Sequence, residues 1–258
     1  MIALLSACAA PAVRFDRVAA EQGCARTVQH GRGFDHVVYQ CRSFDMVSSL
    51  HVYLEGDGTP WINHTRIAED PTPAEPVALA LMGEDPTPAI LLGRPCYHGL
   101  SQSGGCSPAD WTDRRYSEEV VASMVVALET LIRQHRARSI TLIGYSGGGT
   151  LAMLIAARVR QVQEVITLAA NLDVGAWAKY HDYSALTGSL DPAQLPALPA
   201  SVRQFHLLGG KDANVPPWMA EPVIRRQPNT KWQVLAGVDH ACCWAKIWPE
   251  VLKQLPAP

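Results

Sequence analysis

Residues 139–159 constrain the fold of this chain more than any other stretch. They read SITLIGYSGGGTLAMLIAARV, in which a short β-branched run, a glycine-rich turn and an Ala/Leu-rich run follow one another. The first run, 139–143, predicts a buried strand, and 150–159, free of Pro and Gly, predicts a buried helix. The turn between them, 144–148, fits the pattern G-x-S-x-G.

A serine at such a junction has a chemical use. A sharp strand-to-helix turn strains the serine backbone and lifts its hydroxyl clear of the sheet edge. The strand and helix nearly touch there, so small neighbours are needed, and Gly144 and Gly148 fill those positions. The alternative is a flexible Gly147-Gly148-Gly149 turn, but the flanking strand and helix favour Ser146 as a nucleophile.

Length and composition suit one large domain rather than a nucleic-acid-binding protein. The chain has 258 residues, of which 48% are hydrophobic and 18% charged, so it can bury a sizeable core. Its net charge of −2 offers no field that attracts nucleic acid. The basic residues at 133–138 close an expected helix, where they suit the negative end of the helix dipole.

The N-terminus resembles a bacterial lipoprotein signal. Residues 5–8 read Leu-Ser-Ala-Cys, like a lipobox in which Cys8 is lipidated and becomes the mature N-terminus. A basic segment is missing and the apolar run is short, so an incidental cysteine in a small-residue tail is the alternative. We expect residues 1–20 to be a signal remnant and tether, and 21–258 to be one domain.

The remaining cysteines form an even set, which suits disulfides and an oxidising compartment. Proximity in the chain favours the pairs Cys24–Cys41 and Cys96–Cys106, which leaves the adjacent Cys242–Cys243 as the third and least secure pair. A zinc site is disfavoured because no C-x2-C pair occurs. We therefore expect the cell envelope, with a possible membrane anchor through Cys8. Free thiols in a cytoplasmic protein are the alternative.

Strands and helices alternate along most of the chain, which predicts an α/β fold with a mainly parallel sheet and helices on both faces. The expected strands lie at 25–29, 34–41, 50–54, 89–93, 139–143, 164–169, 202–208 and 231–235, and the expected helices at 76–82, 117–134, 150–159 and 248–255.

Two loops carry backbone groups suited to an oxyanion. In an acyl-transfer hydrolase one donor is the N–H that follows the nucleophile, here Gly147, and the other comes from a loop after an earlier strand. The glycine-rich segment after 50–54 is the candidate, with Gly56 or Asp57 as donor. A plain surface turn is the alternative for this segment.

A nucleophilic serine needs a base, and the base needs an acid to fix its tautomer. His240 follows one expected strand and Asp212 follows the strand before it, so both should reach the sheet edge of Ser146. The main rival for the acid is Asp173, which follows the preceding strand.

These motifs resemble those of the α/β-hydrolase superfamily over nearly all of residues 50–255. The resemblance is carried by GYSGG at 144–148, the GGKDANVP loop with Asp212, GVDH with His240, and the order nucleophile, acid, histidine. It implies the superfamily's fold and a two-step acyl transfer through an acyl-serine, with no metal or organic cofactor. A carboxylic-ester hydrolase is the expected function. A peptidase, thioesterase or acyltransferase on the same triad, or a non-catalytic envelope lipoprotein, are the alternatives.

The substrate is expected to be a small acyl compound. A long irregular stretch rich in aromatic residues, 171–199, predicts a cap over the site. Tyr145, Tyr97 and His181 are candidates for substrate contact. The sequence does not indicate an oligomeric state.

Overall fold

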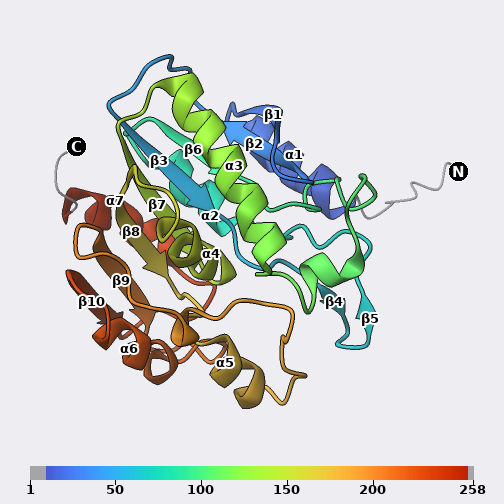
Figure 1. Cartoon of the computed structure of the whole chain (residues 1–258), viewed down its shortest axis with the longest axis vertical. Coiled ribbons are helices and arrows are strands. Elements are labelled where there is room, and N and C mark those ends of the chain that lie inside the picture. The colour runs from blue at the N-terminus through green and yellow to red at the C-terminus, as the bar shows by residue number, and fades with distance from the viewer. Residues whose placement is uncertain (1–9, 255–258) are drawn as a thin grey trace, which may run out of the picture.

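The computed structural model describes residues 10–254. Within them, eight strands form one sheet in the order β1-β2-β6-β3-β7-β8-β9-β10, with helices on both faces (Figure 1). The strands from β6 to β10 run parallel, and β2 runs antiparallel to both of its neighbours, β1 and β6. The predicted α/β class is confirmed. The strands of this sheet are β1 (Ala25–His30), β2 (Asp35–Gln40), β3 (Ser49–Leu54), β6 (Ala89–Leu92), β7 (Ser139–Tyr145), β8 (Val162–Leu168), β9 (Arg203–Gly209) and β10 (Thr230–Leu235).

The two strands at the centre place the loops that matter for function. β3 and β7 are apolar and almost wholly buried, as expected for strands covered on both faces. They pair in parallel from Ser49 opposite Ser139 to Leu54 opposite Gly144. Because this register aligns the ends of the two strands, the loop that begins at Glu55 lies beside Ser146.

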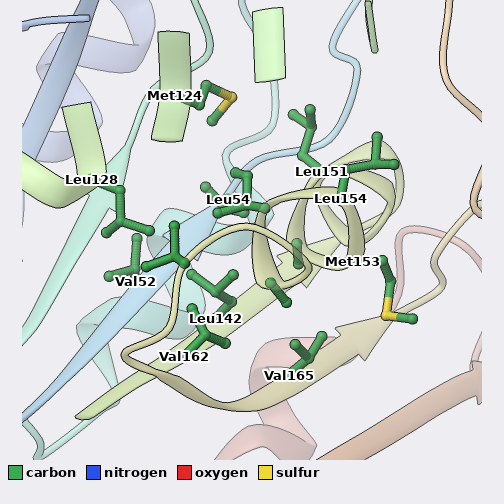
Figure 2. Close-up of a cluster of buried hydrophobic side chains, with 14 of the residues drawn as sticks. Val52, Leu54, Met124, Leu128, Leu142, Leu151, Met153, Leu154, Val162 and Val165 are labelled. Carbon is green, nitrogen blue, oxygen red and sulfur yellow. The ribbon is translucent and has the colours of Figure 1, made fainter. Parts of the chain in front are cut away.

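The helices bury two separate cores, one on each face of the sheet. Buried residues of α3, α4 and α6 belong to the first core, and those of α1, α2 and α7 to the second. Figure 2 shows Met124 and Leu128 of α3 and Leu151 of α4 packed against the sheet. The helices are α1 (Pro11–Glu21), α2 (Val77–Gly83), α3 (Glu118–His135), α4 (Gly147–Ala156), α5 (Val174–Tyr180), α6 (Pro217–Arg225) and α7 (Trp244–Gln254), with short 3-10 turns η1 (Pro108–Trp111) and η2 (Pro192–Gln194). Within residues 10–254, no helix has the length and apolar character needed to cross a membrane.

Residues 11–20, expected in a tether, form most of α1 instead. Ala12, Phe15 and Ala19 are buried at helical spacing, and Phe15 packs against Tyr39 of β2. The Tyr39 hydroxyl donates to Asp16, which ties the helix to the sheet. Two of the three buried positions are alanines, so the apolar stripe is weak in the sequence.

The structure contains the three expected disulfides, Cys24–Cys41, Cys96–Cys106 and Cys242–Cys243. Cys8, the possible lipidation site, lies outside the described residues.

Candidate active site

Ser146 occupies the strained turn that the sequence predicts. It lies between β7 and α4 with φ 51° and ψ −124°, a conformation rare for a residue with a side chain. A Cβ on Gly144 would overlap the carbonyl oxygen of Gly148, and one on Gly148 would overlap that of Leu54. The glycines around Ser146 are therefore required by the close approach of strand and helix.

A chain of hydrogen bonds runs from Ser146 through His240 to Asp212. His240 Nε2 lies 3.1 Å from Ser146 Oγ, and His240 Nδ1 lies 2.8 Å from Asp212 Oδ2. The buried Asp212 is fixed in turn, because its Oδ1 accepts hydrogen bonds from the backbone N–H groups of Asn214 and Val215. Asp212 follows β9 and His240 follows β10, so strand order alone brings them to the edge where Ser146 lies.

The neighbouring carboxylates are bonded elsewhere. Asp173 caps α5, where its Oδ1 accepts from the N–H of Ala176 at 2.8 Å. Asp239 accepts from the N–H groups of Ala241 and Cys242. Of the two candidates for the acid, Asp212 is thus the one hydrogen-bonded to the histidine.

The His240 loop is held from behind. The hydroxyl of Tyr145 donates to the backbone oxygen of His240 at 2.9 Å, and the indole N–H of Trp244 donates to the same oxygen at 2.8 Å. Tyr145, a candidate for substrate contact, lines the cavity and also positions the histidine.

Two backbone N–H groups are placed to receive an oxyanion. Gly147 opens α4, and the first N–H groups of a helix have no partner within it. In the loop after β3, Gly56 packs against Ser146, but its N–H donates to the Glu55 carboxylate at 3.3 Å. The N–H of Asp57 makes no hydrogen bond among the described residues. Of the two predicted donors in this loop, Asp57 is therefore better placed.

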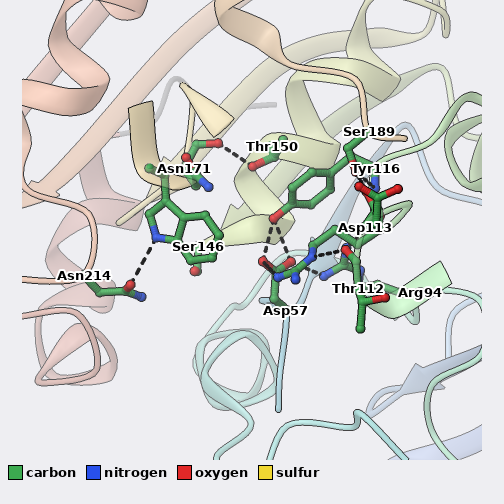
Figure 3. Close-up of polar contacts among 12 residues, drawn as sticks. Asp57, Arg94, Thr112, Asp113, Tyr116, Ser146, Thr150, Asn171, Ser189 and Asn214 are labelled. Atoms are coloured by element: carbon green, nitrogen blue, oxygen red, sulfur yellow. Dashed lines mark hydrogen bonds and ion pairs between the residues drawn. The ribbon is translucent and has the colours of Figure 1, made fainter. Parts of the chain in front are cut away.

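Asp57 is held by four side chains, a set we call the Asp57 clamp. Its carboxylate pairs with Arg94 and with the hydroxyl of Tyr116 (Figure 3), and with Arg115 at 3.0 Å. Its backbone oxygen accepts from the hydroxyl of Tyr97 at 2.9 Å. Burial acts to raise the pKa of Asp57, but the two guanidinium groups and the Tyr116 hydroxyl outweigh it and lower the pKa to about 2.

Glu55, two residues earlier, has the opposite electrostatic setting. It is buried without a cationic partner, and its side chain accepts from the N–H groups of Gly56 and, at the start of α2, Leu79. Burial raises the pKa of Glu55 to about 7, although these N–H groups act in the other direction. One short loop therefore holds two carboxyl groups whose pKa values are shifted in opposite directions, that of Asp57 downward and that of Glu55 upward.

A cavity of about 820 Å³ opens over Ser146. One side of it is formed by loop 55–60 and by a hairpin of β4 (Trp61–Ile62) and β5 (Arg66–Ile67), the other by residues of the expected cap. The cap residues that line it are Asn171, Trp177, Asp182, Tyr183, Ser184, Ala185 and Leu186.

Two of the three candidates for substrate contact do not line this cavity, and each of them supports a residue that does. Tyr97 is buried, and its hydroxyl donates to the backbone oxygen of Asp57. The Nε2 atom of His181 lies 2.8 Å from the backbone oxygen of Asn214.

Several lining and supporting residues were not expected from the sequence. Arg94 and Arg115 are separated from Asp57 by more than 30 residues, and no local pattern links them. The hairpin that carries Trp61 and His64 is too short to give a strand pattern. Asn171 lies three residues after the end of β8, and the sequence pattern marks it only as the start of the expected cap.

Comparisons with known proteins show the fold. The chain superposes on a puromycin-hydrolyzing peptidase of Mycobacterium tuberculosis with a TM-score of 0.62 and 14% identity, covering 89% of this chain and 38% of that longer one. Est1E from Butyrivibrio proteoclasticus gives a TM-score of 0.59 and 15% identity, with coverage of 89% and 96%. An esterase of Pyrococcus furiosus gives a TM-score of 0.59 and 14% identity, and the match covers 91% of this chain and 92% of the esterase. The chain therefore has the α/β-hydrolase fold.

Sequence comparisons add no family. No protein-family model matches the chain, and no curated protein matches it either. Because the structural relatives are at most 15% identical among those described, they establish architecture, and the activity has to be argued from the site.

Proposed function

We propose that this protein is a serine hydrolase that cleaves carboxylic esters through an acyl-serine intermediate. The observation that carries the proposal is the hydrogen-bonded series Ser146–His240–Asp212, with the serine held in a strained turn at the floor of a cavity. The structural relatives named as esterases and as a peptidase support a hydrolase on this fold.

The mechanism follows from the placement of these groups. His240 takes the proton of Ser146 as Oγ attacks the ester carbonyl, and Asp212 stabilises the imidazolium that forms. The N–H groups of Gly147 and Asp57 bind the oxyanion of the tetrahedral intermediate. The leaving alcohol receives the proton from His240. Water, activated by the same histidine, then releases the acid and restores Ser146.

An ester is proposed rather than an amide because an alkoxide leaves more readily than an amine anion. A peptidase, thioesterase or acyltransferase would use the same three residues. A peptidase and a thioesterase differ from an esterase in the leaving group, and an acyltransferase differs in the acyl acceptor, and the triad determines neither.

The test is hydrolysis of p-nitrophenyl esters from acetate to palmitate, together with labelling by a fluorophosphonate probe. We expect turnover and labelling of the native protein, and loss of both in Ser146→Ala, while circular dichroism shows that the variant is folded. The chain-length profile would size the acyl pocket. A folded native protein that neither turns over any ester nor reacts with the probe would overturn the proposal and favour a binding function.

We also propose that the protein works in the cell envelope and is lipidated on Cys8. The disulfides support an oxidising compartment. Metabolic labelling with a fatty acid in a bacterial host is expected to mark the native chain but not Cys8→Ser. Equal labelling of both, or labelling of neither, would contradict lipidation at this residue.

A further inference from the structure

Asn171 is the one lining residue of the described cavity whose buried side chain has no partner. Its side chain is 3% exposed, and neither its amide nitrogen nor its amide oxygen makes a hydrogen bond among residues 10–254. Its backbone oxygen, in contrast, accepts from the hydroxyl of Thr150 (Figure 3). A buried amide without partners is unfavourable, so its presence in the cavity wall indicates a group that it binds.

The shape of an amide limits what that group can be. The donor and the acceptor of Asn171 lie side by side, about 2 Å apart, and point the same way. A trans peptide unit presents its N–H and C=O in opposite directions, and a carboxylate has no donor. Two hydroxyls on adjacent carbons present a donor and an acceptor at matching spacing, and such pairs are the recurring feature of sugars and polyols.

The aromatic side chains of the cavity suit the same ligand. Trp61 on the β4–β5 hairpin is 42% exposed and Tyr183 on the cap is 43% exposed, although both are large and apolar. Trp177 also lines the cavity, and its indole N–H donates a hydrogen bond to the side-chain oxygen of Asn214. Flat, exposed rings that line a cavity can pack against the C–H face of a sugar ring.

The charges of the lining argue against an anionic substrate. The acidic residues Glu75, Asp113 and Asp182 are part of the cavity lining. Among the described residues, Arg115 is the only lysine or arginine in the lining, and it is paired with Asp57. A neutral ligand rich in hydroxyl groups can donate to these carboxylates, whereas an anion would be repelled by them.

We propose that the substrate is an O-acylated sugar or polyol, whose free hydroxyls are bound by Asn171 and whose ring packs against Trp61. The inference rests on the proposed ester hydrolysis. Ser146 Oγ forms a bond to the acyl carbon, the bond from that carbon to the sugar oxygen breaks, and the sugar oxygen takes the proton held by His240. Water then adds to the acyl-serine, so the products are the deacylated sugar and the carboxylic acid.

The experiment compares esters that differ in their hydroxyl groups. One set contains the monoacetates of methyl glucopyranoside, with one acetyl position for each compound. The reference is cyclohexyl acetate, which has a ring of similar size and no hydroxyl. We expect kcat/KM for at least one sugar acetate to exceed that for cyclohexyl acetate by about tenfold or more, because a site built for hydroxyls discriminates against an analogue that lacks them.

Two variants test the residues. Asn171→Leu keeps the branched shape of the side chain and removes its hydrogen bonds, so the preference ratio should fall by about tenfold. Trp61→Ala should lower the ratio severalfold, and Asn171→Asp, which can still accept from hydroxyls, should retain part of it. Trp218→Ala is the matched control, because Trp218 is 56% exposed but does not line the cavity, and it should leave the ratio unchanged.

The outcomes separate the inference from the proposed function. Turnover of cyclohexyl acetate equal to that of every sugar acetate would overturn the sugar inference and leave the ester hydrolase in place. No turnover of either class, with no probe labelling of Ser146, would overturn the hydrolase itself. A sugar preference that survives in both Asn171→Leu and Trp61→Ala would show that these residues do not read the substrate.

Discussion

The two walls of the cavity are built in opposite ways. On the wall formed by the loop after β3, the Asp57 carboxylate and backbone oxygen are both paired with buried side chains. On the cap wall, the Asn171 amide has no partner among the described residues, and Tyr183 and Asp182 are exposed. The Asp57 side chain is fully paired without a ligand, whereas the cap wall has side-chain groups left to bind one.

The difference follows from what each wall has to do. An oxyanion donor must already be in place when charge develops, because reorganising it during the reaction would cost part of the stabilisation. The side chains of the clamp fix the Asp57 N–H, the proposed oxyanion donor, in this way. A surface that selects a substrate needs unused hydrogen-bonding groups and exposed rings. Variants of the Asp57 clamp should therefore alter stability and kcat, and variants of the cap wall should alter KM.

The largest effect is expected from Asp57→Asn. This change removes the carboxylate that neutralises Arg94 and Arg115, which are almost fully buried. Breaking a buried ion pair from one side leaves uncompensated charge, so we expect the free energy of unfolding to fall by about 3 kcal/mol or more. Urea denaturation measures this loss.

The control for this variant lies on the opposite wall. Asp182 is exposed and has φ 55°, a conformation that asparagine tolerates as well as aspartate. Asp182→Asn should change the free energy of unfolding by less than about 0.5 kcal/mol. Equal losses in the two variants would show that the clamp is no more important to stability than an exposed carboxylate.

The second effect concerns Glu55 and pH. A carboxyl with a pKa of about 7 in the folded protein and 4.5 in the unfolded chain binds more protons when folded. Its contribution to stability is therefore complete below pH 4.5 and is lost as the pH rises through 7, by up to about 3 kcal/mol. Asp57 acts in the opposite direction, since its contribution is present above pH 3.8 and lost as the pH falls toward 2.

Urea denaturation between pH 5 and pH 8 tests the Glu55 prediction. The native protein should lose stability across this range, and Glu55→Gln should lose much less, because it has no proton to release. The quantity compared is the slope of the free energy of unfolding against pH, so an overall loss of stability in the variant does not affect the result. Parallel slopes for the two proteins would contradict the assigned pKa.

These contrasts also show which parts of the molecule were predictable from the sequence. Ser146, Asp212 and His240 each follow a clear strand, and parallel strands end at one edge, so their meeting could be predicted from local patterns. The sequence could not predict which aspartate, Asp212 or Asp173, bonds to the histidine, because both of them follow a strand.

The clamp and α1 illustrate two physical limits. Arg94 and Arg115 reach Asp57 only through tertiary structure, and no spacing in the chain records that contact. In α1 the buried stripe consists largely of alanines, which differ little in hydrophobicity from the residues around them. The sequence pattern therefore predicts a tether where the structure has a helix. Sequence patterns identify groups held by strands, and they miss groups brought together by long loops.

A smaller effect is expected from Tyr97→Phe, which removes one hydroxyl from the clamp and keeps the ring. The backbone oxygen of Asp57 loses its hydrogen bond, so the adjoining N–H is less well fixed. We expect kcat to fall by about tenfold, which corresponds to about 1.4 kcal/mol, with KM little changed. Tyr39→Phe is the control, since its buried hydroxyl bonds Asp16 of α1 away from the cavity. Tyr39→Phe should lower stability while leaving kcat unchanged. A similar loss of kcat in both variants would show that Tyr97 has no specific role in positioning the Asp57 N–H.

The smallest effect is expected on the cap. Tyr183 stacks on His181 at the rim of the cavity, and its ring is 43% exposed. Tyr183→Ala should change the free energy of unfolding by less than about 0.5 kcal/mol and raise KM by about threefold with kcat unchanged. Tyr180→Ala is matched to it, because Tyr180 is 49% exposed but lies outside the cavity lining, and its KM should remain that of the native protein. A fall in kcat for Tyr183→Ala as large as that for Tyr97→Phe would mean that the cap takes part in the reaction step, and the division of labour between the two walls would then be wrong.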